Sequence, residues 1–424
     1  MWQDKWSTYR DLIQEQVTPA LGCTEPVSTA LACAKAVQLL DQTVERMEVM
    51  VSGNLLKNGM GVGIPGTGET GLLIAAALGA VCGDPDKGLE VLDNANPANV
   101  AIARQMVDDG RIQLSQVDSP SILYVKVIAY AGKDTATVVI QDYHTNIAFQ
   151  SLNGKVIAST ADTDKPVEEK EKPDLSISAI YEFATQADVE KLTFILKASE
   201  LNCALSDLGL EQDYGLKIGK VLRDSTVDGL STRDLMSQAM IRSAAASDAR
   251  MGGAMLPAMS NSGSGNQGIA ATMPVVAVAN CIGAQESQLV RALIMSHLIA
   301  IHIKSHMHVL SAFCAATTAA VGASAAITWL MGGGEKEVES AIFNIFGDVT
   351  GVLCDGAGSG CSLKVSTSAQ AAVKSAIMAM NGVRITSHEG IIEDSVESTI
   401  DNIGHIANDG LANADKLIIK IMST

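Results

Sequence analysis

The segment between Lys304 and Glu335 contains no Asp, Glu, Lys or Arg. A run of this length without charge could span a bilayer, so the chain must place it either in a membrane or in a protein core. Its residues are mostly small (SAFCAATTAAVGASAA), and it lacks basic flanks and an aromatic belt. We therefore predict a helix that is buried inside the protein.

The overall composition favours closely packed helices. Of the 424 residues, 47% are hydrophobic but only 4% are aromatic, so Ala, Val, Ile, Leu and Met must build the core. This length suggests two or three domains. The formal net charge of −17 argues against binding nucleic acid or an anionic membrane, because both require clustered Lys and Arg.

The start of the chain, MWQDKWSTYRDLIQEQ, is charged and amphipathic and has no apolar signal-peptide core. We therefore expect a cytoplasmic protein whose eight cysteines stay reduced. Metal binding, catalysis and plain burial are then the roles open to these thiols.

The pattern along the chain predicts an α+β fold, with a large all-helical domain and a smaller α/β domain containing an antiparallel sheet. Residues 7–41 predict helix interrupted around TPALGCTEP, where Thr24 is the expected cap. A strand is expected at 44–52, and β-branched runs between 121 and 160 predict the antiparallel sheet. The charged, proline-bearing segment 160–175 predicts an exposed linker, and everything after it reads as helix.

Three glycine-rich stretches match G-x-G-x-x-G: GVGIPG (61–66), GTGETG (66–71) and GSGNQG (263–268). The first two overlap, and Pro65 breaks the expected run from turn to helix. No strand precedes the third, so the dinucleotide fingerprint is incomplete. Backbone N–H groups with Ser and Asn side chains could hold a carboxylate or small anion. Turns that need glycine, without any ligand, are the alternative.

Two cysteines bound the stretch CDGAGSGC, Cys354 and Cys361. Their spacing matches neither a zinc ribbon nor the ferredoxin run. Glycines between cluster ligands let the chain curl around the sulfur atoms and direct N–H groups at them. Cys314 lies 40 positions before Cys354, and three thiolates would leave one coordination position open. Buried thiols without a metal remain the alternative.

Several motifs together resemble the L-cysteine desulfidase family, which is related to iron–sulfur-dependent L-serine dehydratases with a helical catalytic domain. They are LGCTEPVSTALA, SGNLLKNGMGVGIPGTG, HTNI (144–147), NSGSGNQGI and CDGAGSGCSLKV, and they cover nearly the whole chain in order. The resemblance implies a [4Fe–4S] cluster held by Cys314, Cys354 and Cys361, with one iron free for substrate. It also implies that Cys23 is a catalytic group, with the base as its expected role.

The implied activity is that of a carbon–sulfur lyase in cysteine catabolism. L-Cysteine would undergo α,β-elimination to pyruvate, ammonia and hydrogen sulfide, with iron acting as a Lewis acid. An L-serine dehydratase and a non-enzymatic amino-acid or cluster sensor remain the alternatives. We expect the chain to divide into three parts. Residues 1–42 would form N-terminal helices that pack on the catalytic domain, residues 43–160 the α/β domain, and residues 175–424 the helical cluster-binding catalytic domain. A homodimer and a small amino-acid substrate are the partners that we consider.

The remaining candidate residues follow from their chemistry and place in these motifs. A helix beginning near Thr24 would favour the thiolate of Cys23. Beside Cys23, the expected catalytic residues are Glu25 and His144, each with an ordinary structural role as the alternative. The expected substrate-binding residues are Asn54, Lys57, Asn58, Asn146, Ser262, Ser264 and Asn266. His302 and His306 lack a metal motif, so we expect packed, hydrogen-bonded roles for them.

Overall fold

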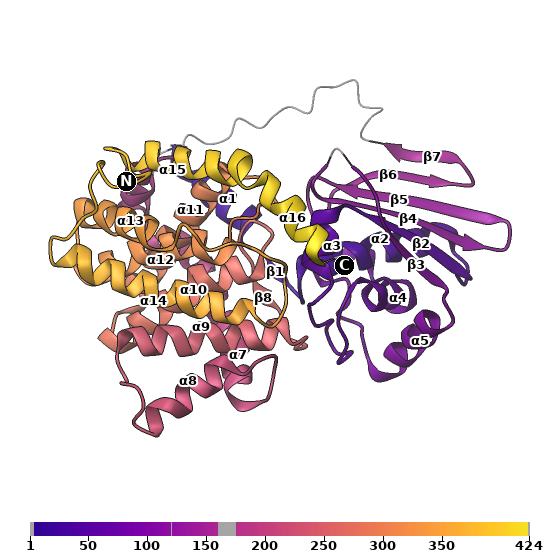
Figure 1. Ribbon diagram of the computed structural model, residues 1–424, viewed down its shortest axis with the longest axis horizontal. Coiled ribbons are helices and arrows are strands. Elements are labelled where there is room, and N and C mark those ends of the chain that lie inside the picture. Colours follow the sequence, from indigo (N-terminus) through magenta and orange to yellow (C-terminus); the bar gives the residue numbers. More distant parts are fainter. Residues whose placement is uncertain (1–3, 120, 160–174, 423–424) are drawn as a thin grey trace.

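The computed structural model describes residues 4–119, 121–159 and 175–422. Its elements surround two hydrophobic cores, a larger helical one and a smaller one beneath a sheet (Figure 1). The predicted α+β fold is thus confirmed. Most of the predicted linker at 160–175 lies outside the described residues.

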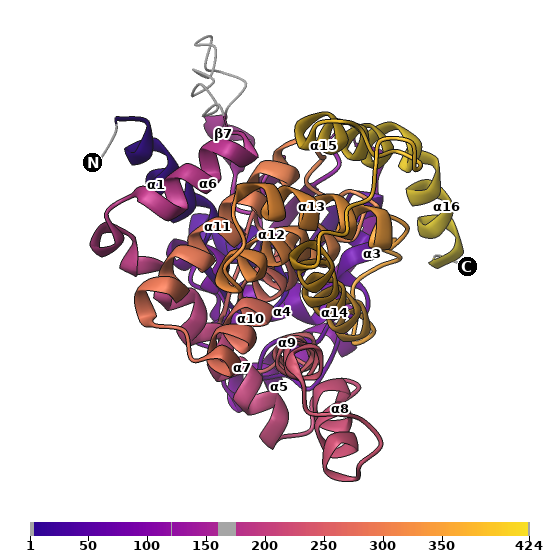
Figure 2. The same cartoon turned by 90° about the vertical axis from the view of Figure 1, so that its left-hand side faces the viewer.

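The uncharged segment forms α12 (Ala315–Leu330) at the centre of the helical part. It packs against α10 (Gly265–Ile282), α11 (Glu286–Ser305), α13 (Glu335–Val349) and α14 (Cys361–Met380) (Figure 2). All its residues except Ala315 and Trp329 are buried, which confirms the predicted buried helix. Within the described residues, no helix is both long and apolar enough to cross a membrane.

Further helices complete this part of the molecule, and a short two-stranded antiparallel sheet lies within it. Trp6, Tyr9 and Ile13 of the first helix pack into the helical core. These elements are α1 (Asp4–Gln16), α6 (Ile177–Gln186), η3 (Val189–Ile195), α7 (Leu196–Glu211), α8 (Ile218–Val227), α9 (Leu235–Met251), α15 (Val396–His405), η4 (Ile406–Gly410), α16 (Ala412–Met422), β1 (Pro19–Ala20) and β8 (Ala258–Met259).

The main sheet has six strands in the order β3-β2-β4-β5-β6-β7. β2 and β3 pair in parallel, and the other neighbours pair antiparallel. The strands are β2 (Arg46–Val51), β3 (Ile112–Gln116), β4 (Tyr124–Ala131), β5 (Asp134–Gln141), β6 (Ile147–Leu152) and β7 (Lys155–Ser159). The β-branched runs are therefore strands, as predicted, whereas β3 was not predicted and makes the sheet mixed.

One face of this sheet is covered by α2 (Thr24–Leu40), which contacts β4 and β5. Alternate residues of β4 are buried, as expected for a strand with one covered face. The other helical elements of this part are α3 (Gly53–Gly59), α4 (Leu72–Cys82), η1 (Pro85–Glu90) and α5 (Pro97–Asp108). Thus α1 belongs to the helical core and α2 to the sheet core, while the division at 42, 160 and 175 stays a prediction.

The prediction of Thr24 as the helix cap was wrong by one residue. Cys23 is the N-cap of α2, and its side chain makes no capping hydrogen bond. The Thr24 hydroxyl donates instead to the Glu25 carboxylate at 3.2 Å. The thiol is thereby placed at the first exposed N–H groups of the helix, where Thr24 had been expected.

Substitution of Gly322 by alanine tests the close packing of α12. A Cβ at this position would overlap the carbonyl oxygen of Ser296 on α11. We expect Gly322→Ala to lower the free energy of unfolding by about 1–3 kcal/mol, the usual effect of overpacking a core. Urea denaturation followed by circular dichroism measures this change.

Gly351→Ala is the matched control, because no atom lies within 4 Å of a Cβ built at Gly351. Equal unfolding midpoints for the two variants would show that α12 tolerates additional volume, contrary to the packing described.

Candidate active site

A cavity of about 100 Å³ lies between the two cores and is lined by residues from both. The sheet side contributes Cys23, Thr24, Glu25, Asn58 and His144, and the helical side contributes Arg250, Met251, Ser262, Ser264, Asn266, Lys304, Cys314, Cys354, Cys361 and Lys364. Most of the residues predicted from the sequence therefore meet at one place. Asn54, Lys57 and Asn146 are the predicted residues that do not line the cavity.

Four helices begin at this cavity. Cys23, Ser264 and Cys314 are the N-caps of α2, α10 and α12, and Cys361 is the first residue of α14. The first N–H groups of a helix have no partner within the helix, and the helix dipole places positive charge there. The cavity wall is therefore suited to anionic groups.

Two of the cysteine-bearing segments run side by side. Phe313 and Leu353 form an antiparallel bridge, the Cys354 N–H donates to the Ala312 carbonyl at 2.7 Å, and the Cys314 N–H donates to the Val352 carbonyl at 3.1 Å. The chain then curls through the glycines of CDGAGSGC and returns at Cys361. Backbone pairing thus brings together thiols that lie 40 positions apart in the sequence.

The glycines of the stretch 61–71 allow the two cores to approach closely. Gly61 bridges to Gly358, the Gly63 N–H donates to the Met251 carbonyl at 2.9 Å, and a Cβ at Gly63 would overlap backbone atoms of Gly252 and Gly253. Close backbone packing therefore accounts for these glycines without any bound ligand.

The glycine stretch 263–268 is held by a buried polar network. The Gln267 and Asn261 side-chain amides hydrogen-bond at 2.8 Å, and Asn261 meets Nδ1 of His297 at 3.0 Å. Nε2 of His297 lies 3.0 Å from the Thr272 hydroxyl. Burial lowers the pKa of His297 to about 3, so the ring is neutral. This network fixes the loop that carries Ser262 and Ser264.

Beside Lys364, which lies within CDGAGSGCSLKV, the cavity wall contains two cations that were not predicted from the sequence. Arg250, at the end of α9, is only 4% exposed, and its Nε has no hydrogen-bond partner among the described residues. Arg250 also forms no ion pair with any residue that the structure describes. Lys304 donates to the His308 carbonyl at 2.7 Å, and burial lowers the pKa of this lysine to about 8. Neither cation belongs to a motif, so no sequence signal distinguishes them from ordinary helix residues.

The candidate acid–base groups differ in their protonation. Burial raises the pKa of Cys23 to about 11, and the nearby charge of Arg250 only partly offsets this rise. Cys23 therefore keeps its proton at neutral pH in the protein without a ligand, although its helix N-terminus favours the thiolate. Burial lowers the pKa of His144, whose Nε2 has no partner in the described structure. His144 is therefore neutral and able to accept a proton.

Glu25, the third predicted catalytic residue, is held within the wall of the cavity. Its carboxylate accepts hydrogen bonds from the Asn58 side chain at 3.1 Å and from Thr24 at 3.2 Å. Asn146 lies outside the cavity and donates to the Gln141 carbonyl at 3.0 Å. The predicted roles of these residues toward a substrate stay predictions.

The cavity thiols do not form a site for a single metal ion in the part of the chain that the structure describes. Among the described residues, no group of three or more His, Cys, Asp or Glu side chains could hold a single ion. Cys314 is nevertheless close enough to raise the pKa of both Cys354 and Cys361 by charge repulsion, with burial as the larger cause. His302 and His306 are hydrogen-bonded to Glu397 at 2.7 Å and Asp401 at 3.0 Å, the packed role that was expected.

Comparison with known proteins defines the family. The family model described as serine dehydratase alpha chain matches residues 86–420. The chain is 50% identical over 421 residues to a UPF0597 protein of Aeromonas salmonicida, which covers 99% of this chain and 96% of the relative. It is 47% identical over 428 residues to a UPF0597 protein of Oleidesulfovibrio alaskensis, and this match covers 100% of this chain and 99% of the relative. The chain belongs to the serine dehydratase alpha chain family.

Thiol labelling tests the electrostatics of the site without assuming any activity. Cys281 is exposed and Cys23 is buried. A pKa of about 11 leaves roughly 100-fold less thiolate than the ordinary value of 9.0. We expect iodoacetamide at pH 7.5 to alkylate Cys281 at least about 100-fold faster than Cys23, as followed by peptide mass spectrometry. Urea-unfolded protein, in which all cysteines should react alike, is the control. Equal rates in the folded protein would contradict the buried, protonated state of Cys23.

Proposed function

We propose that the protein is an iron–sulfur-dependent lyase that converts L-cysteine to pyruvate, ammonia and hydrogen sulfide. The observation that carries this proposal is the meeting of Cys23 with Cys314, Cys354 and Cys361 at one cavity. Family membership supports a lyase, because dehydration of serine is the same elimination with a different leaving group.

Cys314, Cys354 and Cys361 suit a [4Fe–4S] cluster as a donor set. All three are free thiols that line the same cavity, and cysteine thiolates are the usual ligands of such clusters. Helix N–H groups and neighbouring lysines would offset the negative charge of thiolates and cluster. These cysteines would hold the cluster, which supplies a Lewis acid for the leaving group when bound.

Arg250, the loop carrying Ser262 and Ser264, and Asn266 of α10 would bind the substrate carboxylate. A buried guanidinium without an anionic partner is costly, and the unpartnered Nε of Arg250 is a donor for such a group. The N-terminus of α10 adds further donors. A carboxylate there would relieve the unpaired charge of Arg250.

Cys23 and His144 would perform the proton transfers. Arg250 is close enough to influence the pKa of both groups, so a substrate held by Arg250 presents its Cα proton to the same part of the cavity. Elimination removes this proton while the bond from Cβ to sulfur breaks. The aminoacrylate formed then takes up water to give pyruvate and ammonia.

L-Serine is the second candidate substrate, because the matching family model is described as serine dehydratase. Its reaction would yield pyruvate and ammonia with water in place of hydrogen sulfide. Direct comparison of the two amino acids therefore separates the two functions.

Anaerobic purification followed by iron and product analysis tests the proposal. We expect about four iron atoms per chain and sulfide released from L-cysteine faster than pyruvate from L-serine. Pyruvate from L-serine without sulfide release would select the second candidate. Absence of iron under strict anaerobiosis, or no product from either amino acid, would contradict both.

Individual alanine variants test the donor set. We expect Cys314→Ala, Cys354→Ala and Cys361→Ala each to lose the visible absorption of the cluster. Cys281→Ala, at an exposed position outside the cavity, is the control and should keep it. Loss of the cluster in that control would refute the assigned ligands.

Cys23→Ala separates chemistry from cluster binding. We expect turnover to fall by about 10²- to 10⁴-fold, the usual contribution of an acid–base group, with the iron content unchanged. Cys33→Ala is the matched control, because Cys33 is buried on the same helix but does not line the cavity. An amino-acid or cluster sensor would show unchanged ligand or cluster binding in both variants and no turnover in the wild type.

A further inference from the structure

We propose that Asp415 on the C-terminal helix is a positioning residue for the cysteine-bearing segments of the cavity. It would act through Lys57 and Asn54, two residues that the sequence analysis had assigned to substrate binding. The inference rests on the proposed function insofar as those segments hold a cluster, but the contacts that support it are independent of iron.

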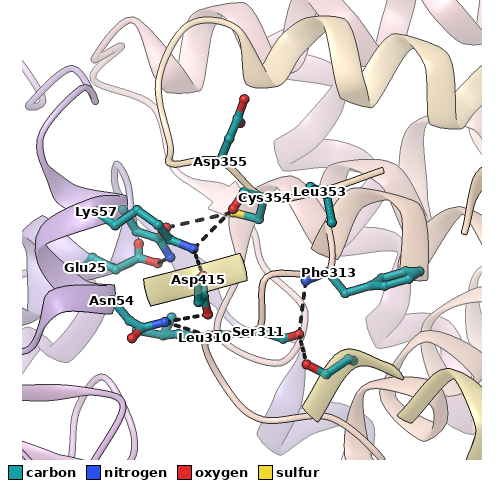
Figure 3. A network of polar contacts seen from close by, with 12 residues as sticks. Glu25, Asn54, Lys57, Leu310, Ser311, Phe313, Leu353, Cys354, Asp355 and Asp415 are labelled. Carbon is teal, nitrogen blue, oxygen red and sulfur yellow. Dashed lines mark hydrogen bonds and ion pairs between the residues drawn. The ribbon is translucent and has the colours of Figure 1, made fainter. Parts of the chain in front are cut away.

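Asp415 binds two side chains of α3 with its two carboxylate oxygens (Figure 3). Nζ of Lys57 donates to Oδ1 at 2.5 Å, and Nδ2 of Asn54 donates to Oδ2 at 2.8 Å. The Lys57 side chain is fully buried and the Asp415 side chain is 12% exposed. Because a buried ammonium group requires a counter-ion, removing the carboxylate would leave Lys57 uncompensated.

Each of these α3 side chains also reaches one cysteine-bearing segment. Lys57 donates a second hydrogen bond to the carbonyl of Cys354 itself, at 3.2 Å. Asn54 donates to the carbonyl of Leu310, at 3.3 Å, in the segment that leads to Cys314. One carboxylate from the C-terminal helix therefore orients the two donors that hold the two neighbouring segments.

Other contacts place the same C-terminal elements against these segments. The hydroxyl of Ser311 donates to the Ala407 carbonyl of η4 at 3.4 Å, and it accepts from the Phe313 N–H at 3.1 Å. A Cβ at Gly356 would crowd both the side chain of Met422 and the carbonyl of Lys57. Residues 310–311 and 354–356 thus make contacts with α3 and with the C-terminal elements.

Lys57 and Asn54 are therefore fully engaged away from the cavity. Neither lines it, and each divides its hydrogen bonds between Asp415 and a backbone carbonyl. This arrangement accounts for the polar residues Asn54 and Lys57 within SGNLLKNG without requiring them to touch the substrate.

Hydrogen–deuterium exchange on the full-length protein tests the inference without iron. We expect Asp415→Asn to raise amide exchange about tenfold in peptides covering 308–316 and 350–358, because the donors lose their charged partner. Peptides from α12 should exchange as in the wild type. Asp409→Asn is the matched control, because Asp409 lies nearby in an exposed pair with His405.

Iron release gives the second readout. After anaerobic reconstitution, we expect an iron(II) chelator to remove iron from Asp415→Asn about tenfold faster than from the wild type or Asp409→Asn. The double variant Asn54→Asp/Asp415→Asn swaps the two side chains and so returns a carboxylate to the surroundings of Lys57. Relative to Asp415→Asn alone, it should slow both iron release and amide exchange at 350–358.

Unchanged exchange in Asp415→Asn would overturn the inference, as would an increase spread evenly over the helical core. If Asp415→Asn alone fails to fold, the double variant decides. A folded double variant whose 350–358 segment is protected from amide exchange supports the inference, whereas a double variant that also fails to fold overturns it. A wild type that binds no iron while Asp415→Asn shows the localised exchange would refute the proposed function and leave the positioning role supported.

Discussion

The close packing of α12 is the constraint on which the rest of the structure depends. A helix surrounded by four others has no solvent-facing side, so its side chains must be small and uncharged. That requirement fixes the depth and direction of the helix, and so fixes the position of Cys314 at its N-cap. The neighbouring helices α10 and α14 begin at the same level, where Ser264 and Cys361 face the cavity. The cavity therefore follows from how the helical core is packed.

Charge at the cavity is then set by the helix termini. N–H groups of four helices, together with Arg250 and Lys304, give one small space a concentration of positive potential within a chain of net charge −17. Thiolates, a carboxylate or a cluster carrying negative charge would be stabilised there, and a neutral ligand would not. Burial opposes the same ionisation, which is why Cys23 remains a thiol at neutral pH in the protein without a ligand.

Patterns that are local in sequence could be predicted, and pairings across the chain could not. The helices and most strands follow from periodicity, but β3 (IQLSQ) is short and polar and forms through its parallel pairing with β2. The motif cysteines were found because they belong to recognisable segments. Arg250 belongs to no motif, and it is distinguished by a buried Nε that has no hydrogen-bond partner among the described residues. The pairing of Lys57 with Asp415 could not be predicted, because the two residues lie 358 positions apart.

The site draws on residues from Cys23 to Val365 and is braced by Asp415, so it depends on contacts between segments that lie far apart in the sequence. Loop-closure entropy makes such contacts late events in folding, formed after both cores exist. The cavity therefore cannot assemble until the chain has been synthesised at least as far as Val365. Any cofactor that requires this cavity must consequently be inserted into a chain whose two cores have already come together.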